Sequence, residues 1–209
     1  MATTSRPDIF AVGQISRYCA NYTSTHWNAV IRIFSYLKGT TNLRLRYGGK
    51  ELPLTIVYCG AEYKGDLDDR RSTSGYIFFC NGGPVCWESR KQSITAQSTT
   101  ESPNIYLRTK QKKEGACFCQ VVLDITGVNI MPLIIKYGNN AAIAAAHRQG
   151  RTKHIQIKIN LIRENIRTGK IKMECVASED QLADIFTKPL RSPAFQEMRK
   201  RIGLNQVSA

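Results

Sequence analysis

The sequence predicts an α/β protein in which helices flank the faces of a mixed β-sheet. Two observations predict this class. Runs of apolar or alternating residues, which are typical of strands, interchange along the chain with segments of helical periodicity. From about residue 54 the expected order is strand, strand, strand, helix, strand, helix, helix, strand, helix, and this order fits a mixed sheet with helices on its faces.

Residues 1–50 are expected to form an N-terminal appendage of helices and one strand. Asp8 to Ala20 is predicted as a short helix. A stronger helix follows the N-cap sequence Thr23-Ser24-Thr25 and ends at Gly39. Alternating residues from Leu43 to Tyr47 indicate a strand. The apolar residues of the stronger helix recur at helical spacing: Trp27, Val30, Ile33, Phe34 and Leu37.

Five strand-like segments and four helical segments follow the appendage. The turn Asn81-Gly82-Gly83-Pro84 is expected to join the second and third strands of the sheet as an antiparallel hairpin. The expected strands are Leu54–Cys59, Tyr76–Cys80, Val85–Trp87, Pro132–Tyr137 and Lys170–Val176. The expected helices are about Thr100–Thr126 (closed by Gly127), Asn140–His147, Ile155–Arg167 and Glu179–Phe186.

The chain is strongly basic. Thirty Lys and Arg residues against sixteen Asp and Glu give a formal net charge of +14. Such an excess favours a polyanionic partner, most often nucleic acid and less often an anionic membrane surface, although a merely basic surface is the alternative. The longest apolar runs are too short to cross a bilayer, and the N-terminus offers no apolar signal-peptide core. We therefore expect an intracellular location, in the nucleus or the cytoplasm.

The seven cysteines indicate free thiols in a reducing compartment. Their number is odd, their spacing is scattered, and no C-x-x-C pair occurs. Several alternate with apolar residues and are expected to act as small hydrophobic side chains. The three histidines are not spaced to complete a zinc site with them.

Four blocks of sequence carry a specific resemblance. They are Gly65–Tyr76 (GDLDDRRSTSGY), Trp87–Ser93 (WESRKQS), Arg151–Ile155 (RTKHI) and Glu179–Leu190 (EDQLADIFTKPL). These blocks resemble the ribonuclease H domain of Ty1/copia-type retrotransposon Pol polyproteins. Ser5–Ile9 and His26–Thr41 resemble the segment that links reverse transcriptase to ribonuclease H in that family. The resemblance divides the chain into a connection remnant at 1–50, a ribonuclease H-like domain at 51–190 and a basic C-terminal tail at 191–209.

The resemblance implies a ribonuclease H fold with a central five-stranded mixed sheet flanked by helices. It also implies hydrolysis of the RNA strand of an RNA–DNA hybrid by two divalent ions. Two ions about 3.5–4 Å apart hold the attacking and leaving oxygens, and Mg²⁺ requires oxygen ligands in near-octahedral geometry. Four carboxylates usually supply those oxygens in this family.

Two of the four family carboxylates are missing from this chain. Gly60 and Gly138 occupy the first and third ligand positions, whereas Glu101 and Asp184 retain the second and fourth. Glu62 shares a strand face with Gly60, but it lies roughly 6.6 Å further along and is expected to be a solvated side chain. We therefore expect no tightly bound cofactor, and Mg²⁺ or Mn²⁺ binding only if activity survives.

The retained residues also have plain structural interpretations. Glu101 favours a helix N-terminus through the helix dipole, and Pro103 shortly after it can shift where that helix begins. Asp184 alone would fit a charge on a helix surface, although its motif favours a remnant metal ligand. His154 is interpreted as a structural histidine rather than a general base.

Basic clusters mark the residues expected to contact nucleic acid. A further cluster at Arg199-Lys200-Arg201 lies near the C-terminus. Phosphate contacts of this kind carry no sequence information, so binding to a hybrid or a duplex is expected to be non-specific. The expected nucleic-acid-binding residues are Arg108, Lys110, Lys112, Lys113, Arg151 and Lys153.

The favoured hypothesis is a catalytically inactive ribonuclease H-like domain with residual nucleic-acid affinity. One alternative is an active ribonuclease H that hydrolyses RNA in RNA–DNA hybrids. The other is a retroelement-derived interaction protein, recruited as a secreted RxLR-type effector of a plant pathogen and acting on a host protein inside host cells. Leu43–Arg46 and Lys188–Arg191 only approach an R-x-L-R sequence.

Overall fold

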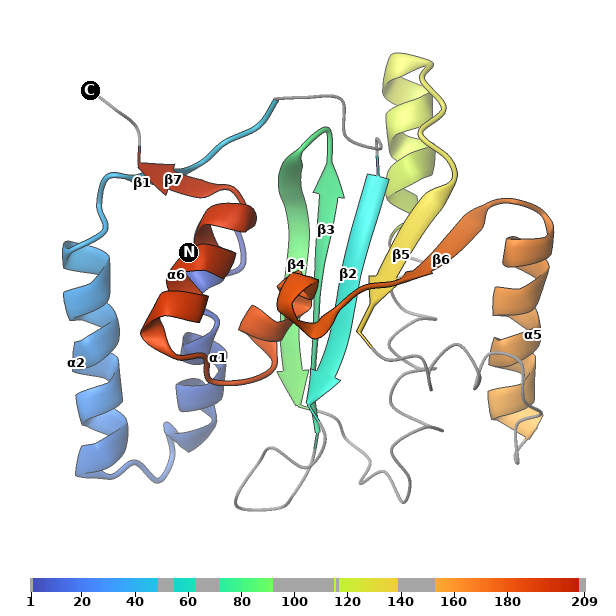
Figure 1. Cartoon of the computed structure of the whole chain (residues 1–209). Helices are drawn as coiled ribbons and strands as arrows, with labels where there is room; N and C mark the ends of the chain where they lie inside the picture. The colour runs from blue at the N-terminus through green and yellow to red at the C-terminus, as the bar shows by residue number, and fades with distance from the viewer. Residues whose placement is uncertain are drawn as a thin grey trace.

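The computed structural model has a five-stranded sheet at its centre, helices beside it, and a small lobe formed by both ends of the chain (Figure 1). It describes residues 2–48, 55–62, 72–91, 115, 117–138 and 153–206. The predicted helix at 140–147 lies outside these residues, as does most of the predicted helix at 100–126.

The strand order in the sheet is β4-β3-β2-β5-β6. Its first three members are antiparallel neighbours, whereas β5 runs parallel to β2 and β6 runs parallel to β5. This topology confirms the predicted α/β class and the ribonuclease H-like mixed sheet of five strands flanked by helices. The strands are β2 (Thr55–Glu62), β3 (Thr73–Cys80), β4 (Gly83–Lys91), β5 (Leu133–Tyr137) and β6 (Ile171–Cys175).

The hairpin between β3 and β4 forms where it was predicted, but both strands are longer than expected. Asn81 and Gly82 at its turn have φ values of 48° and 76°, the left-handed conformation that a tight two-residue hairpin requires. The early part of β3 was missed because Thr73 and Ser74 are polar yet buried. Polar residues that face a protein interior hide the alternation on which strand prediction depends.

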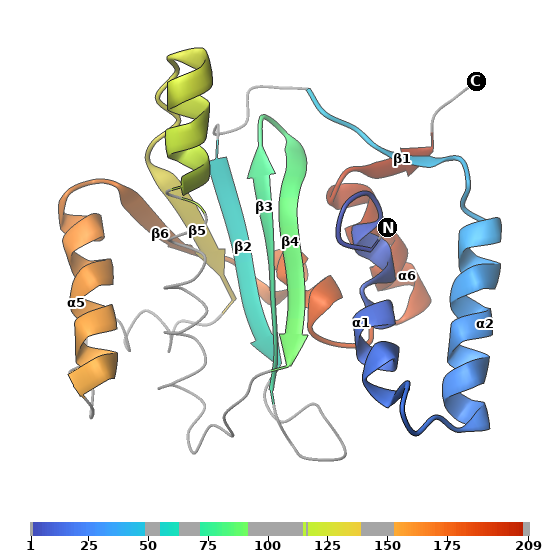
Figure 2. The same ribbon diagram turned by 180° about the vertical axis from the view of Figure 1, so that it is seen from behind.

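One face of the sheet packs against a helix at 117–126 (Figure 2). Phe118 of that helix meets Phe78 of β3 in an edge-to-face contact, with ring centroids 5.2 Å apart. The helix closes at Gly127, whose φ of +70° is the left-handed value typical of a helix C-terminus, as predicted. The buried residues on this face are Val57, Cys59, Tyr76, Phe78, Leu133, Ile135, Tyr137 and Ile171.

The opposite face of the sheet packs against a short irregular segment, η4 (Leu182–Phe186), and against the C-terminal helix. A single helix was predicted over Glu179–Phe186, and this was wrong. Two 3-10 turns form instead, η3 (Ser178–Asp180) and η4, because Gln181 between them is extended. The Gln181 side chain accepts a hydrogen bond from the backbone N–H of Ala183 and thereby caps the N-terminus of η4.

Residues far apart in the sequence make up the lobe. Its short strands β1 (Leu43–Leu45) and β7 (Leu204–Gln206) pair antiparallel. The residues predicted to be a basic tail are therefore folded, as α6 (Ser192–Arg201) and β7, and Ile202 and Leu204 are fully buried. The remaining elements of the lobe are η1 (Pro7–Ile9), α1 (Ala11–Ile15), η2 (Ser16–Tyr18) and α2 (Ser24–Lys38).

The first predicted helix, Asp8 to Ala20, is broken into three pieces in the structure, whereas α2 forms as expected. Gly13 lowers helix propensity in the broken stretch, and the Ser16 hydroxyl donates a hydrogen bond to the Gly13 carbonyl. The predicted N-cap Thr23 precedes α2, and its backbone N–H donates to His26 Nδ1 at 3.1 Å.

A buried polar network holds the lobe together. The Arg6 guanidinium donates to both carboxylate oxygens of Asp8, at 2.9 and 2.8 Å, and to Thr40 Oγ1 at 2.8 Å. The Tyr36 hydroxyl donates to Asp8 at 2.6 Å and accepts from Arg199 of α6 at 3.0 Å. Hydrogen bonding to Asp8 raises the pKa of Arg6, and burial raises the pKa of Tyr36. These bonds tie η1, α2 and α6 into one unit.

We expect Ile202→Ala to lower the free energy of unfolding by about 2–5 kcal/mol, because it opens a cavity at a fully buried side chain. Ile166→Ala on α5 (Lys153–Arg167), where the side chain is 39% exposed, is the control and should change stability by about 0.5 kcal/mol or less. Urea unfolding followed by circular dichroism measures both. An unchanged transition in Ile202→Ala would mean that the C-terminal segment lies outside the cooperative unit.

Candidate functional site

The two glycines at the first and third ligand positions lie side by side. Cys59 of β2 pairs with Tyr137 of the parallel strand β5. The next residues, Gly60 and Gly138, are therefore neighbours near the C-terminal ends of these two strands. A Cβ atom at position 60 would lie 3.5 Å from Asp184 Oδ1. A Cβ at position 138 would lie 3.5 Å from Gln181 Nε2. The structure therefore brings Gly60, Gly138 and Asp184 together around Gln181.

Gln181 holds this site in place and was not singled out from the sequence. Its side chain is almost fully buried, at 2% exposure. Its Nε2 donates to the backbone carbonyl of Cys59 at 3.1 Å, and its Oε1 accepts from the backbone N–H of Ala183 at 3.2 Å. The available signal was its position inside the EDQLAD block, one residue before a buried Leu-Ala pair.

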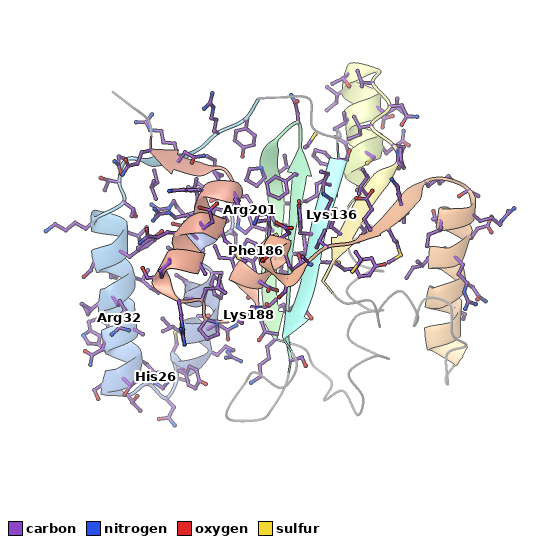
Figure 3. All side chains as sticks on the ribbon, viewed as in Figure 1. His26, Arg32, Lys136, Phe186, Lys188 and Arg201 are labelled. Carbon is purple, nitrogen blue, oxygen red and sulfur yellow. The ribbon has the colours of Figure 1, made fainter. Side chains whose placement is uncertain are left out.

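Asp184 has a basic partner that sequence reasoning also missed. Lys188, which is labelled in Figure 3, follows the end of η4, and its Nζ lies 2.5 Å from Asp184 Oδ2. The Asp184 side chain is only 13% exposed, whereas that of Lys188 is 37% exposed. The carboxylate is therefore neutralised from within the protein. The i, i+4 spacing of Asp and Lys was the signal in the sequence.

The described side chains at this site do not fit a two-metal centre. Gly60 and Gly138 offer no side-chain ligand, and the Gln181 amide is engaged with the backbone at both ends. Asp184 remains as a single carboxylate, already paired with Lys188. Within the described part of the chain, no three His, Cys, Asp or Glu side chains gather where they could hold a metal ion.

Most of the predicted nucleic-acid-binding residues fall outside what the structure describes. The helix α5 includes Lys153 and His154, but their side chains are not described, and neither is that of Glu62 on β2. The predicted residues that lie outside the described ranges are Glu101, Arg108, Lys110, Lys112, Lys113 and Arg151.

The third basic cluster, at Arg199-Lys200-Arg201, is partly used for internal contacts. Arg199 donates to the Tyr36 hydroxyl at 3.0 Å. Arg201 donates to the Glu179 carbonyl at 2.9 Å and forms an ion pair with Asp180 at 2.8 Å. Two of its three cations thus hold α6 in place.

Among the described helices, none is long and apolar enough to cross a membrane.

Comparison with solved structures finds ribonucleases H. LC11-RNase H1, isolated from compost by a metagenomic approach, superposes with a TM-score of 0.48 at 11% identity, over 70% of this chain and 98% of that protein. The structure of LC11-RNase H1 in complex with an RNA/DNA hybrid superposes with a TM-score of 0.41 at 9% identity, over 64% of this chain and 93% of that one.

A shorter protein also matches part of the sequence. Secreted RxLR effector protein 161 of Plasmopara viticola is 39% identical over 102 residues, which are 48% of this chain and 72% of the effector. No family model matches the chain.

The matches that run over almost the whole chain are Pol polyproteins. The retrovirus-related Pol polyprotein from transposon TNT 1-94 of Nicotiana tabacum is 31% identical over 205 residues, or 96% of this chain. That from transposon RE2 of Arabidopsis thaliana is 34% identical over 207 residues, or 97%. This chain spans only 15% and 14% of the lengths of these two polyproteins. Its sequence belongs to the family of copia-type retrotransposon Pol polyproteins.

Proposed function

We propose that this chain is a catalytically inactive ribonuclease H-like domain that retains non-specific affinity for nucleic acid. The observation that carries the proposal is the pair of glycines at positions 60 and 138, which face Asp184 and Gln181 where a metal site would need carboxylates. Family membership and the sheet topology supply the ribonuclease H-like framework.

Charge balance argues against two-ion catalysis at this site. Two Mg²⁺ ions bring four positive charges into one small volume, and carboxylates must offset their mutual repulsion. At the described part of the site the only carboxylate is Asp184, and Lys188 already neutralises it. A divalent ion would have to displace that ammonium group and would gain one ligand by doing so. Glu101 alone would not make up the missing charge.

The basic lobe supports retained affinity for a polyanion. Residues 2–48 and 191–206 contain ten Lys and Arg residues but only two acidic ones, Asp8 and Glu197. Asp8 is buried against Arg6 and leaves little negative charge on the surface. Phosphate contacts to exposed cations need no metal and no particular base sequence. The exposed cations of this lobe, apart from Arg201, are Arg17, Arg32, Lys38, Arg44, Arg46, Arg191 and Lys200.

The match to RxLR effector protein 161 favours a second candidate function, an interaction protein delivered into host cells. For this candidate we infer that the protein is secreted, enters host cells and binds a host protein there. Expression of a tagged copy in plant cells, followed by affinity purification, tests it against a tagged Gly75→Ala variant. That variant should misfold because the added Cβ would lie 2.6 Å from the Phe186 Cβ. Partners recovered equally with both proteins would count against the candidate.

The purified chain should not cleave an RNA–DNA hybrid above background with either Mg²⁺ or Mn²⁺, because the site lacks the charge to hold two ions. A labelled hybrid resolved on a denaturing gel measures this. Glu101→Gln and Asp184→Asn are the controls for the remnant carboxylates. Metal-dependent cleavage that either variant abolishes would show that the remnant site works, and the proposal would fail.

Binding to duplex, hybrid and single strands should be similar and should weaken steeply with salt, because each neutralised phosphate releases condensed counterions. For about six phosphate contacts we expect affinity to fall roughly a thousandfold between about 50 and 200 mM salt. Fluorescence anisotropy of labelled oligonucleotides measures this. Arg44→Gln/Arg46→Gln should reduce the salt slope, whereas Ile166→Ala is the matched control. Undetectable or salt-insensitive binding would contradict the proposal.

The double change Gly60→Asp/Gly138→Asp should recreate a metal-responsive site. Neither glycine has a left-handed φ, and an added Cβ at either position meets only ordinary contacts at 3.5 Å or more. Without metal, clustered carboxylates repel one another, so the variant should be less stable and should bind nucleic acid more weakly than the original chain. Mg²⁺ or Mn²⁺ at a hundred times its dissociation constant should then raise the free energy of unfolding of the variant by about 2.7 kcal/mol.

Thermal unfolding with and without metal compares the double variant with the original chain and with each single variant. The single variants should recover much less of the metal response, because two ions act as a unit. An identical metal response in the original and the double variant would mean that positions 60 and 138 do not belong to a metal site.

A further inference from the structure

The helix α2 carries an exposed apolar stripe that nothing in the described part of the chain covers. Trp27, Ile31 and Phe34 are 56%, 48% and 63% exposed. Their spacing of i, i+4 and i+7 places them on one face of the helix. Exposed halves of three such large side chains amount to on the order of 300 Å², as much as the largest apolar patch on many monomers. The other side of α2 packs on the lobe, where Tyr36 joins the buried network.

Positive charge surrounds this stripe. No Asp or Glu occurs between Asp8 and Glu51, a stretch that includes all of α2. Lys38 continues the stripe one turn beyond Phe34, and Arg44 follows on β1. At the other end of the helix, Tyr18 stacks on His26 with ring centroids 4.1 Å apart, which places the neighbouring Arg17 near the start of α2. The stripe is therefore apolar along its centre and cationic at both ends.

We propose that this stripe is a docking surface for an acidic amphipathic helix of another polypeptide segment. The i, i+4, i+7 pattern is the one by which helices pack against helices, and the cations at its ends match carboxylates beside an apolar seam. A second copy of this chain would bring its own cations against these and be repelled. Ile31 at the centre of the stripe cannot stack on a base, which disfavours a nucleic-acid strand.

The comparisons point to a polypeptide occupant as well. In the Pol polyproteins of this family, the stretch that matches this chain is 14–15% of the whole, so that other polypeptide segments adjoin it there. The proposal does not depend on the loss of catalysis or on nucleic-acid binding. The loss of catalysis concerns the site around Gln181. Nucleic-acid binding concerns the exposed cations of the lobe, of which Arg17, Lys38 and Arg44 also flank this surface, whereas its apolar centre is Trp27, Ile31 and Phe34.

Trp27 provides a direct readout of the docking surface. The chain has two tryptophans, and Trp87 is only 9% exposed, so that quenching by acrylamide reports mainly on Trp27. The probe is a synthetic amphipathic helix with leucines along one face and glutamates beside them. Its control is the same peptide with lysines in place of the glutamates. Binding of the acidic peptide should shift the emission to the blue and protect it from quenching, with at least tenfold higher affinity than the lysine peptide.

Matched variants locate the effect. Ile31→Ala/Phe34→Ala retains the Trp27 signal. It should lower the affinity for the acidic peptide at least tenfold, because truncated apolar anchors lose most of their binding energy. Ile157→Ala/Ile166→Ala removes two exposed apolar side chains from α5 and should leave the affinity for the acidic peptide unchanged. Lys38→Glu should reduce the preference for the acidic peptide. All five altered side chains are exposed, and circular dichroism melts should confirm unchanged folding.

Several results would overturn the proposal. They include equal affinity for the two peptides, no saturable binding of the acidic peptide up to about 1 mM, and no effect of Ile31→Ala/Phe34→Ala. A blue shift of Trp27 with oligo(dT) or with phosphatidylglycerol vesicles, but not with the acidic peptide, would assign the stripe to nucleic acid or to a membrane surface. Concentration-dependent dimerisation in sedimentation velocity, lost in Ile31→Ala/Phe34→Ala, would assign it to a second copy.

Discussion

The two hydrogen bonds of the Gln181 side chain are the constraint on which the site and one of the two cores depend. They join the end of β2, at the Cys59 carbonyl, to the first residues of η4. The same attachment sets Asp184 beside Gly60 and directs Leu182, Ile185 and Phe186 into the core. An apolar side chain at this position would remove both bonds and leave the buried backbone N–H of Ala183 without its acceptor, at a cost of about 1–3 kcal/mol. The start of η4, the packing of its apolar residues and the position of Asp184 therefore all depend on the buried amide of Gln181.

Glycine is tolerated at positions 60 and 138 because the fold does not depend on a side chain at either position. Gly60 lies near the end of β2 and Gly138 directly follows β5, both have room for a Cβ atom, and neither belongs to the apolar core. Clustered carboxylates destabilise a metal-free fold, and their loss removes repulsion without opening a cavity. Gly75 shows the opposite case, because Phe186 and Thr187 fill the space that its side chain would need. The space around a position thus decides whether its side chain can change without cost to the fold.

What the sequence predicted correctly was encoded in local patterns. The β3–β4 turn, the cap of α2 and the central strands all rest on neighbouring residues. The structure also brings together Gly60, Gly138 and Asp184, which the family resemblance had singled out. The errors came from contacts between distant residues. Gln181 breaks a predicted helix because it binds Cys59, 122 residues away, and the basic C-terminal segment folds because β1 pairs with β7. Lys188 acquired its significance only when Asp184 was found to lack carboxylate neighbours in the described site.

The proposed loss of catalysis and the proposed affinity for nucleic acid are physically compatible. A carboxylate cluster repels phosphate unless metal ions are bound, so that an intact metal-free site opposes the substrate backbone that it serves. Glycines at positions 60 and 138 contribute no such repulsion, and the Asp184–Lys188 pair adds no net charge. The positive charge of the lobe lies on other elements, α2, β1 and α6, and does not depend on metal. A site without the charge to hold two ions thus also lacks an electrostatic barrier to the phosphate backbone, so that the proposed binding does not require the proposed site to be active.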